Sequence, residues 1–98
     1  MTTHLRGHDV IDPDQRLIGT ISDVLYDQQG EPEWAIVDLG LLRSAHYLPI
    51  AAGRMTESGE FVVPFDKRLV KEAAKADRRH SMDSATEGAL LRHYELAQ

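Results

Sequence analysis

The feature that most constrains the fold is a pair of apolar, β-rich segments joined by a short loop that contains glycine and proline. The first segment runs from residue 17 to 27 and the second from Trp34 to Gly40, with Gly30 and Pro32 between them. Two such runs separated by a turn are typical of a β-hairpin. The chain is therefore expected to be built around an antiparallel pair of strands.

Side-chain alternation in the first segment indicates a β-bulge. Gly19 and Ile21 fall on one face, whereas strict alternation would place Val24 and Tyr26 on the opposite face. A change of this kind near residues 22–23 is explained by one extra residue in the strand, which bends it as a small barrel requires.

The second segment is apolar at nearly every position from Trp34 to Leu39. Strands that are covered on one face alternate, so a continuous apolar run predicts that both faces are covered. One face belongs to the core. The other needs a helix or a second subunit.

Further short strands are expected on either side of this hairpin. They cover residues 8–11, 46–50, 55–57 and 60–65, with a two-residue turn at Ser58 and Gly59 and with Pro49 at an edge, a bulge or a strand end. The loops are too short for crossover helices. The sequence therefore predicts a mainly β fold, a small antiparallel barrel of about six strands.

The pattern becomes helical after Pro64. Asp66 is a candidate N-cap for a short helix over residues 67–76, and residues 77–81 form a polar link. Ser84 to Glu87 fits a capping box, and a second helix would carry an apolar stripe of Leu90, Leu91, Tyr94 and Ala97. We expect a barrel domain over residues 1–75 and a helical extension over 76–98, packed on the barrel or on a partner subunit.

Composition limits the possible functions. The chain has 98 residues, no cysteine and a formal net charge of −5, which excludes disulfides and disfavours direct binding to nucleic acid. Basic residues cluster between positions 67 and 79, where a solvated helix face is the favoured interpretation. No segment approaches the roughly 18 apolar residues of a membrane span and no signal peptide is evident, so we expect a cytoplasmic protein without membrane insertion.

Taken together, the chain resembles the PRC-barrel family over roughly residues 5–75. The matching segments are residues 18–27, Trp34 to Val37, Leu48 to Ile50 and Val62 to Lys67. This family includes the cytoplasmic barrel of the photosynthetic reaction-centre H subunit and the C-terminal domain of a ribosome-maturation factor, and the segment after residue 89 looks like the tail of free-standing bacterial members. The resemblance implies a small β-barrel that acts through protein contacts rather than catalysis.

No set of residues in the sequence predicts a catalytic, cofactor or metal site. Asp23, Asp27 and Asp38 lie near one hairpin, but Asp at turns usually accepts hydrogen bonds from backbone amides. Two histidine pairs, His4 with His8 and His80 with His93, are the candidates for metal ligands, with surface histidines as the favoured interpretation. Serines lie beside acids or histidines at residues 22–23, 44–46 and 80–81, without a nucleophile-elbow motif. We therefore predict no catalytic, cofactor or metal site and no enzyme activity.

The first hypothesis is a self-associating scaffold or adaptor, with a homodimer favoured and an unidentified protein partner as a further possibility. Aromatic side chains concentrate binding energy at interfaces, and Tyr94 could instead hold the last helix against the barrel. The candidate interface residues are Trp34, Ile36, Tyr47, Leu91 and Tyr94. The alternative hypotheses are a regulatory protein that binds a small molecule or metal, and an adaptor that binds RNA through residues 67–79.

Overall fold

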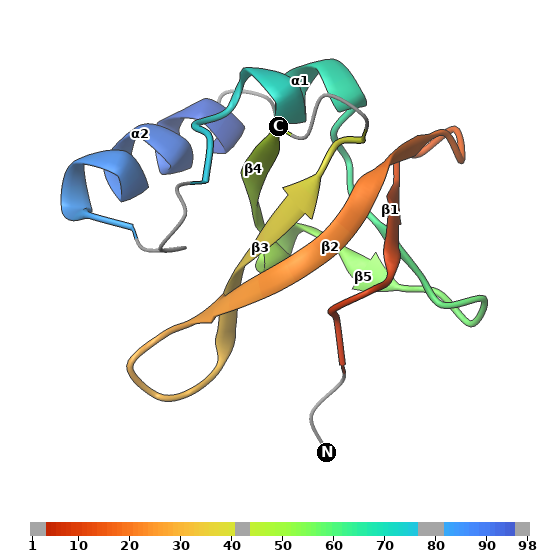
Figure 1. The fold of residues 1–98 in the computed structure, drawn as a ribbon, viewed down its shortest axis with the longest axis horizontal. Coiled ribbons are helices and arrows are strands. Elements are labelled where there is room, and N and C mark those ends of the chain that lie inside the picture. Colours follow the sequence, from red (N-terminus) through yellow and green to blue (C-terminus); the bar gives the residue numbers. More distant parts are fainter. Residues whose placement is uncertain (1–3, 41–43, 77–81, 96–98) are drawn as a thin grey trace.

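The computed structural model describes residues 4–40, 44–76 and 82–95 (Figure 1). Within them the chain is mainly β, with two helices toward the C-terminus, as predicted. The strands are β1 (Asp9–Ile11), β2 (Leu17–Tyr26), β3 (Pro32–Asp38), β4 (Ala45–Pro49), β5 (Arg54–Met55) and β6 (Glu60–Val62), and the helical elements are the 3₁₀ turn η1 (Ile50–Ala52), α1 (Lys67–Glu72) and α2 (Ser84–Glu95).

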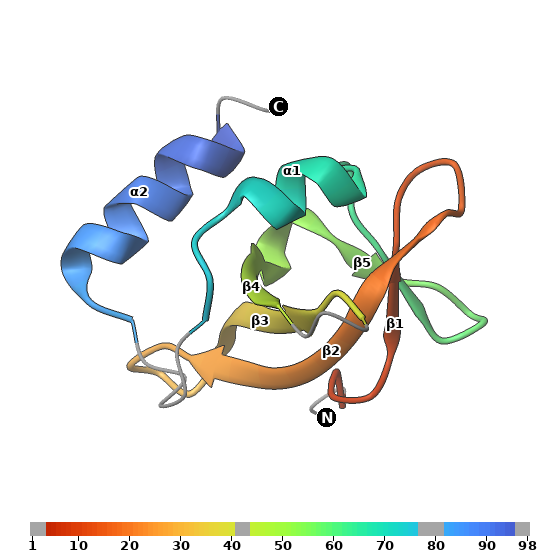
Figure 2. The same cartoon turned by 45° about the horizontal axis from the view of Figure 1, so that its top comes forward.

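The strands form one curled sheet, a half-barrel (Figures 1 and 2). Their order in the sheet is β4-β3-β2-β1-β6-β5. Neighbours are antiparallel except β1 and β6, which run parallel. The expectation of a purely antiparallel meander is therefore wrong at this pair. Because the chain passes through four other strands between β1 and β6, it returns to the free side of β1 with the long connection that a parallel pair needs.

The central hairpin of β2 and β3 has the predicted bulge. Its pairing register shifts between Ile21 and Asp23, which confirms the extra residue inferred from the alternation. Gly19 has a separate role, because a Cβ atom at this position would lie 2.2 Å from the backbone oxygen of Asp38. Only glycine allows the two backbones to approach this closely.

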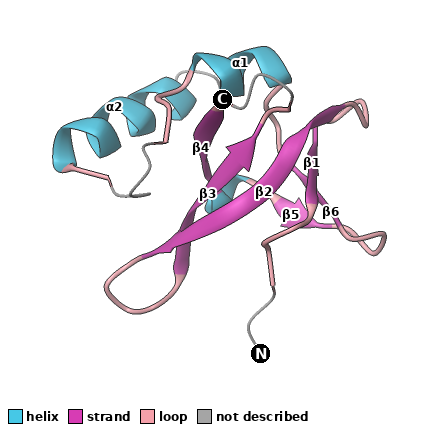
Figure 3. Ribbon diagram, viewed as in Figure 1, coloured by secondary structure: helices cyan, strands magenta, loops and turns pink. Residues whose placement is uncertain are grey.

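Strand β3 is buried on both faces within a single chain. Residues 34–37 are each at most 3% exposed. The core that contains them also includes Val70 of α1 and Leu90 of α2, and both helices lie together at the β4 end of the sheet (Figure 3). The double burial predicted from the sequence is confirmed, and the chain's own helices contribute to the cover.

The outer edge of β4 is occupied by residues 73–76, which we call the strap. The Ala76 N–H donates to the Ala45 oxygen at 2.8 Å, and the Tyr47 N–H donates to the Ala74 oxygen at 3.5 Å. The strap therefore continues the sheet by one short extended segment and covers backbone groups that an edge strand leaves unpaired.

The strap explains why α1 is shorter than predicted. The sequence favours a helix over residues 67–76, but α1 ends at Glu72 and Ala73 is extended. Alanine favours helix, so the helical interpretation of residues 73–76 follows from local propensity. It is wrong because these residues pair with β4 instead, a tertiary contact that local propensity does not report.

His46 holds the strap from the β4 side. Its Nδ1 atom lies 2.9 Å from the Ala73 oxygen, and the side chain is 1% exposed. Since a carbonyl oxygen only accepts, Nδ1 carries the hydrogen in this contact. His46 is therefore a structural residue that bonds across the sheet edge.

The two helices begin at aspartate caps. Asp66 accepts from the Leu69 N–H at 2.9 Å, as predicted. For α2, Asp83 accepts from the Thr86 N–H at 2.7 Å, and this hydrogen bond lowers the pKa of Asp83. The predicted capping box beginning at Ser84 is therefore wrong by one residue, because the preceding carboxylate takes the cap position.

Two proline substitutions distinguish the strap from a continued helix. Ala76→Pro removes an N–H that donates to β4, and we expect the free energy of unfolding to fall by about 1–3 kcal/mol. Lys75→Pro removes no hydrogen bond to β4, and extended backbone tolerates proline, so a smaller loss is expected. Urea unfolding measures both. Equal, large losses would contradict the strap, because proline damages every interior position of a helix.

Candidate functional site

The inner face of α2 attaches this helix to the barrel. Leu90 and Tyr94 are each at most 2% exposed. The Tyr94 hydroxyl donates to the Tyr47 oxygen at 2.5 Å, and its ring centroid lies 4.7 Å from that of Phe65. Burial raises the pKa of the Tyr94 hydroxyl, which keeps it protonated as a donor. The expectation that Tyr94 holds the last helix against the barrel is confirmed.

His93 adds a second attachment, between the two helices. Its Nε2 atom donates to the Leu69 oxygen in α1 at 2.9 Å, and its ring lies nearly perpendicular to that of Tyr94, with centroids 5.1 Å apart. This contact assigns His93 a structural role. Its predicted metal-binding companion, His80, lies outside the described residues.

One side of α2, between its inner and outer faces, borders an apolar groove of about 450 Å³. The groove runs between the helix and the end of the sheet, where β4 continues into η1. Leu91 lies at its edge and is 52% exposed, and Glu95 is its charged lining residue. The full lining consists of Trp34, Pro49, Ala51, Ala52, Leu91, Tyr94 and Glu95.

One wall of the groove contains an unpaired hydrogen-bond donor. Trp34 is 3% exposed, and its Nε1 atom is buried with no acceptor among the residues that the structure describes. Tryptophan N–H groups normally find a partner when buried, because an unmet donor costs free energy. A groove occupant with a carbonyl or carboxylate oxygen could remove this cost if it reached the indole.

The predicted interface residues divide into two groups. Trp34, Ile36, Tyr47 and Tyr94 are each at most 3% exposed, and contacts within one chain account for their burial, whereas Leu91 is exposed. Their role in association stays a prediction, and Leu91 is the member that a partner can reach without opening the fold.

The other residues of the groove were not predicted from the sequence. Glu95 could have been found from its helical spacing with Leu91. Ala51 and Ala52 could not, because their contribution depends on how η1 turns after β4. The residue types alone therefore located the sides of the groove formed by Trp34 and α2, but not the wall formed by η1.

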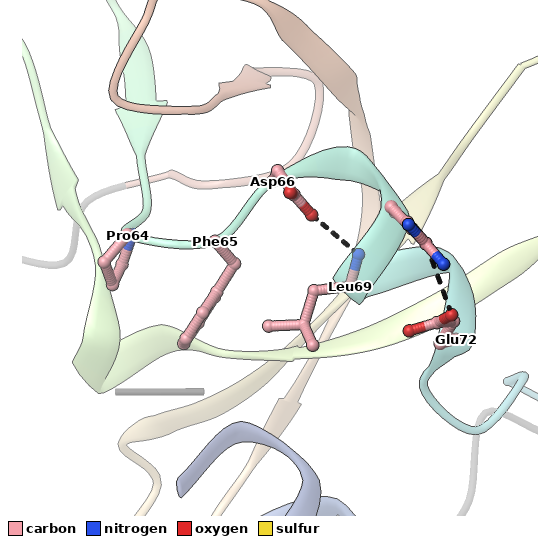
Figure 4. Close-up of a pocket in the computed structure, with 6 residues that line it drawn as sticks. Pro64, Phe65, Asp66, Leu69 and Glu72 are labelled. Carbon is pink, nitrogen blue, oxygen red and sulfur yellow. Dashed lines mark hydrogen bonds and ion pairs between the residues drawn. The ribbon is translucent and has the colours of Figure 1, made fainter. Parts of the chain in front are cut away.

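A second hollow, of about 310 Å³, lies beside α1 (Figure 4). Its charged residues are already engaged with the protein. Asp66 caps the helix at Leu69, and Arg68 Nε lies 3.6 Å from Glu72 Oε2. This hollow therefore offers no charged group that lacks a protein contact. The exposed Lys67, Arg68, Lys71 and Lys75 form the described part of the basic segment.

A third hollow, of about 270 Å³, lies between the N-terminal segment and the central hairpin. Arg6 Nη2 is 2.7 Å from Asp23 Oδ1, and the hydrogen bond to Asp23 raises the pKa of Arg6. The same carboxylate accepts from the Val24 N–H at 2.8 Å. The positive guanidinium and the negative carboxylate neutralise each other, so this ion pair gives the hollow no net charge.

The remaining chemical candidates have structural contacts. Asp27 accepts from two amides of its own turn, and Asp38 accepts from the Gly40 N–H at 3.0 Å. His8 donates to the Gly59 oxygen at 2.7 Å, and Ser22 donates to the Ile36 oxygen at 3.2 Å. Within residues 4–40, 44–76 and 82–95, no group of three or more His, Cys, Asp or Glu side chains could hold a metal ion.

Comparison with known proteins agrees with this architecture. The model of the PRC-barrel domain matches residues 2–81, which covers most of the chain and all six strands. The chain belongs to the PRC-barrel family. The resemblance inferred from the strand segments is thus confirmed, whereas α2 lies beyond the matched residues. No curated protein matches the chain.

Neither described helix of this PRC-barrel chain is long and apolar enough to cross a membrane. The short α1 contributes Val70 to the core, and α2 contributes Leu90 and Tyr94. These three buried side chains therefore serve packing within the chain.

Replacing Tyr94 tests the attachment of α2. We expect Tyr94→Phe to lower the free energy of unfolding by about 1–2 kcal/mol, because the hydrogen bond from the Tyr94 hydroxyl to the Tyr47 oxygen is lost. The parent should also lose stability as the pH rises above the ordinary tyrosine value of 10.0, since the unfolded chain then binds fewer protons than the folded one. The variant should lose less over the same range. Parallel stability curves in urea from pH 7 to 11 would contradict this role.

Proposed function

We propose that this PRC-barrel chain is a non-catalytic protein-interaction module that associates with a second copy of itself through the outer side of α2. The observation that carries this proposal is the half-exposed Leu91 at the edge of an apolar groove. Exposed apolar surface rimmed by polar groups marks interaction sites. The family resemblance supports a role in contacts, because it implies assembly rather than catalysis.

The rest of the chain narrows the location of this contact. The sequence made β3 a candidate interface, but its residues 34–37 are buried within the chain. The outer edge of β4 is covered by the strap. The large hydrophobic side chains exposed among the described residues are Leu17, Tyr26 and Leu91. Tyr26 lines the hollow that contains the Arg6–Asp23 ion pair, whereas Leu91 adjoins a mainly apolar lining.

The expected strength of the contact follows from its size. Full burial of a leucine side chain contributes about 1.5–3 kcal/mol, so burying the exposed half of Leu91 contributes roughly 1 kcal/mol in each copy. Burial of additional apolar area in the groove must supply the rest of the binding free energy. The loss of rigid-body freedom opposes association. The proposal therefore predicts a dimer that dissociates on dilution, not a permanent one.

A small-molecule binding protein is the second candidate function. The unpaired Nε1 of Trp34 supports it, because a ligand with an apolar body and an oxygen acceptor would match both the groove and this donor. Trp34 is the single tryptophan of the chain, so its fluorescence reports occupancy directly. A panel of metabolites that shifts neither the fluorescence nor the melting temperature would count against this candidate.

The primary proposal is tested by two matched leucine substitutions. Leu91→Asp places a charge at the groove and should leave the protein monomeric over a hundredfold concentration range in light scattering. Leu17→Asp is the control, since Leu17 is 57% exposed and does not line the groove. It should retain the concentration-dependent mass of the parent. A parent that is monomeric throughout, or two variants that behave alike, would contradict the proposal.

A further inference from the structure

The outer face of α2 carries two opposite charges beside the groove. Arg92 and Glu95 are exposed and lie three positions apart, so they are neighbours on the helix surface. The ion pairs of the described residues join Arg6 to Asp23 and Arg68 to Glu72. Neither Arg92 nor Glu95 therefore has an ion-pair partner in the part of the chain that the structure describes.

This arrangement is self-complementary in a two-fold dimer. In an isologous contact, if one residue meets a second in the partner, the second meets the first in return. Two α2 helices that cross in opposite directions can therefore place Arg92 of each copy beside Glu95 of the other. Both unpaired charges would gain a partner, and the contact would be made twice.

The same face leaves room for the approach. A Cβ atom added at Gly88 would find only the end of the flexible Arg92 side chain, 3.6 Å away. The face formed by Gly88, Leu91, Arg92 and Glu95 thus combines a small residue, an apolar side chain and complementary charges. Leu91 of one copy can then enter the apolar groove of the other close to that copy's Glu95.

We infer that the occupant of the groove is α2 of a second copy, held in antiparallel orientation by two reciprocal ion pairs between Arg92 and Glu95. The inference rests on the proposed self-association and specifies its geometry. Apolar contact from Leu91 supplies the affinity, while the charges select the orientation, because surface ion pairs add little attraction but like charges oppose a wrong pairing.

Charge reversal tests this geometry. Arg92→Glu alone would place two acidic residues opposite each other at both contacts, and Glu95→Arg would do the same with two basic residues. Each single variant should dimerise at least tenfold more weakly than the parent in light scattering or sedimentation. The double variant restores opposite charges and should return to within about threefold of the parent.

A mixture of the two single variants gives the most specific result. Arg92→Glu carries only acidic residues at this face and Glu95→Arg only basic ones, so the two proteins should form a heterodimer although neither associates well alone. Arg68→Glu is the control for net charge, because it makes the same change on α1, away from the groove. It should leave dimerisation unchanged.

The outcomes separate this inference from the proposed function. If Leu91→Asp abolishes dimers but both charge variants associate like the parent, self-association stands and the reciprocal ion pairs are overturned. Failure of the double variant or of the mixture to associate also overturns the pairing, provided that circular dichroism shows folded proteins. A parent that stays monomeric at all concentrations overturns both.

Discussion

The arrangement of the C-terminal half depends on backbone hydrogen bonds between the strap and β4. A curled sheet that does not close leaves β4 with one unpaired edge, and residues 74–76 cover it in extended form. His46 reinforces the contact through Ala73. Because the strap is extended, α1 ends at Glu72, and α2 follows as a separate helix. That helix packs with Phe65 and bonds to Tyr47.

Because elements of the same chain cover β3, its apolar sequence does not by itself indicate a subunit interface. A strand that is apolar on both faces needs two layers around it, and its sequence does not tell whether the second layer belongs to the same chain. Here the core contains residues of both helices, so residues 34–37 do not require a partner. The surface that we propose for association is therefore the side of α2 that does not face the barrel.

Much of the fold could be predicted because its determinants are local. The bulge follows from the alternation around Ile21, and the short β5–β6 turn follows from Gly59, which has a φ of +85°. The parallel pairing of β1 with β6 could not be predicted, because it depends on how distant segments return across the barrel. The end of α1 at Glu72 was missed for the same reason.

The candidate site was predicted less completely than the fold. Residue type correctly drew attention to Trp34 and Tyr94, but large aromatic side chains serve cores and interfaces equally well. Their burial distinguishes them from Leu91, which shares the helix with Tyr94 but lies on another side. The groove itself arises from the turn η1 meeting α2, a juxtaposition that no pattern within either segment encodes.

The central claim is that the chain covers its own sheet edge and leaves α2 for a partner, and amide hydrogen exchange at several protein concentrations tests it most directly. The account predicts that the amides of Tyr47 and Ala76 exchange slowly at every concentration, since their acceptors lie in the same chain. Protection within α2 should increase as the concentration rises. Rapid exchange at Tyr47 and Ala76 in dilute solution, with protection appearing only on association, would show instead that the β4 edge is the contact between copies.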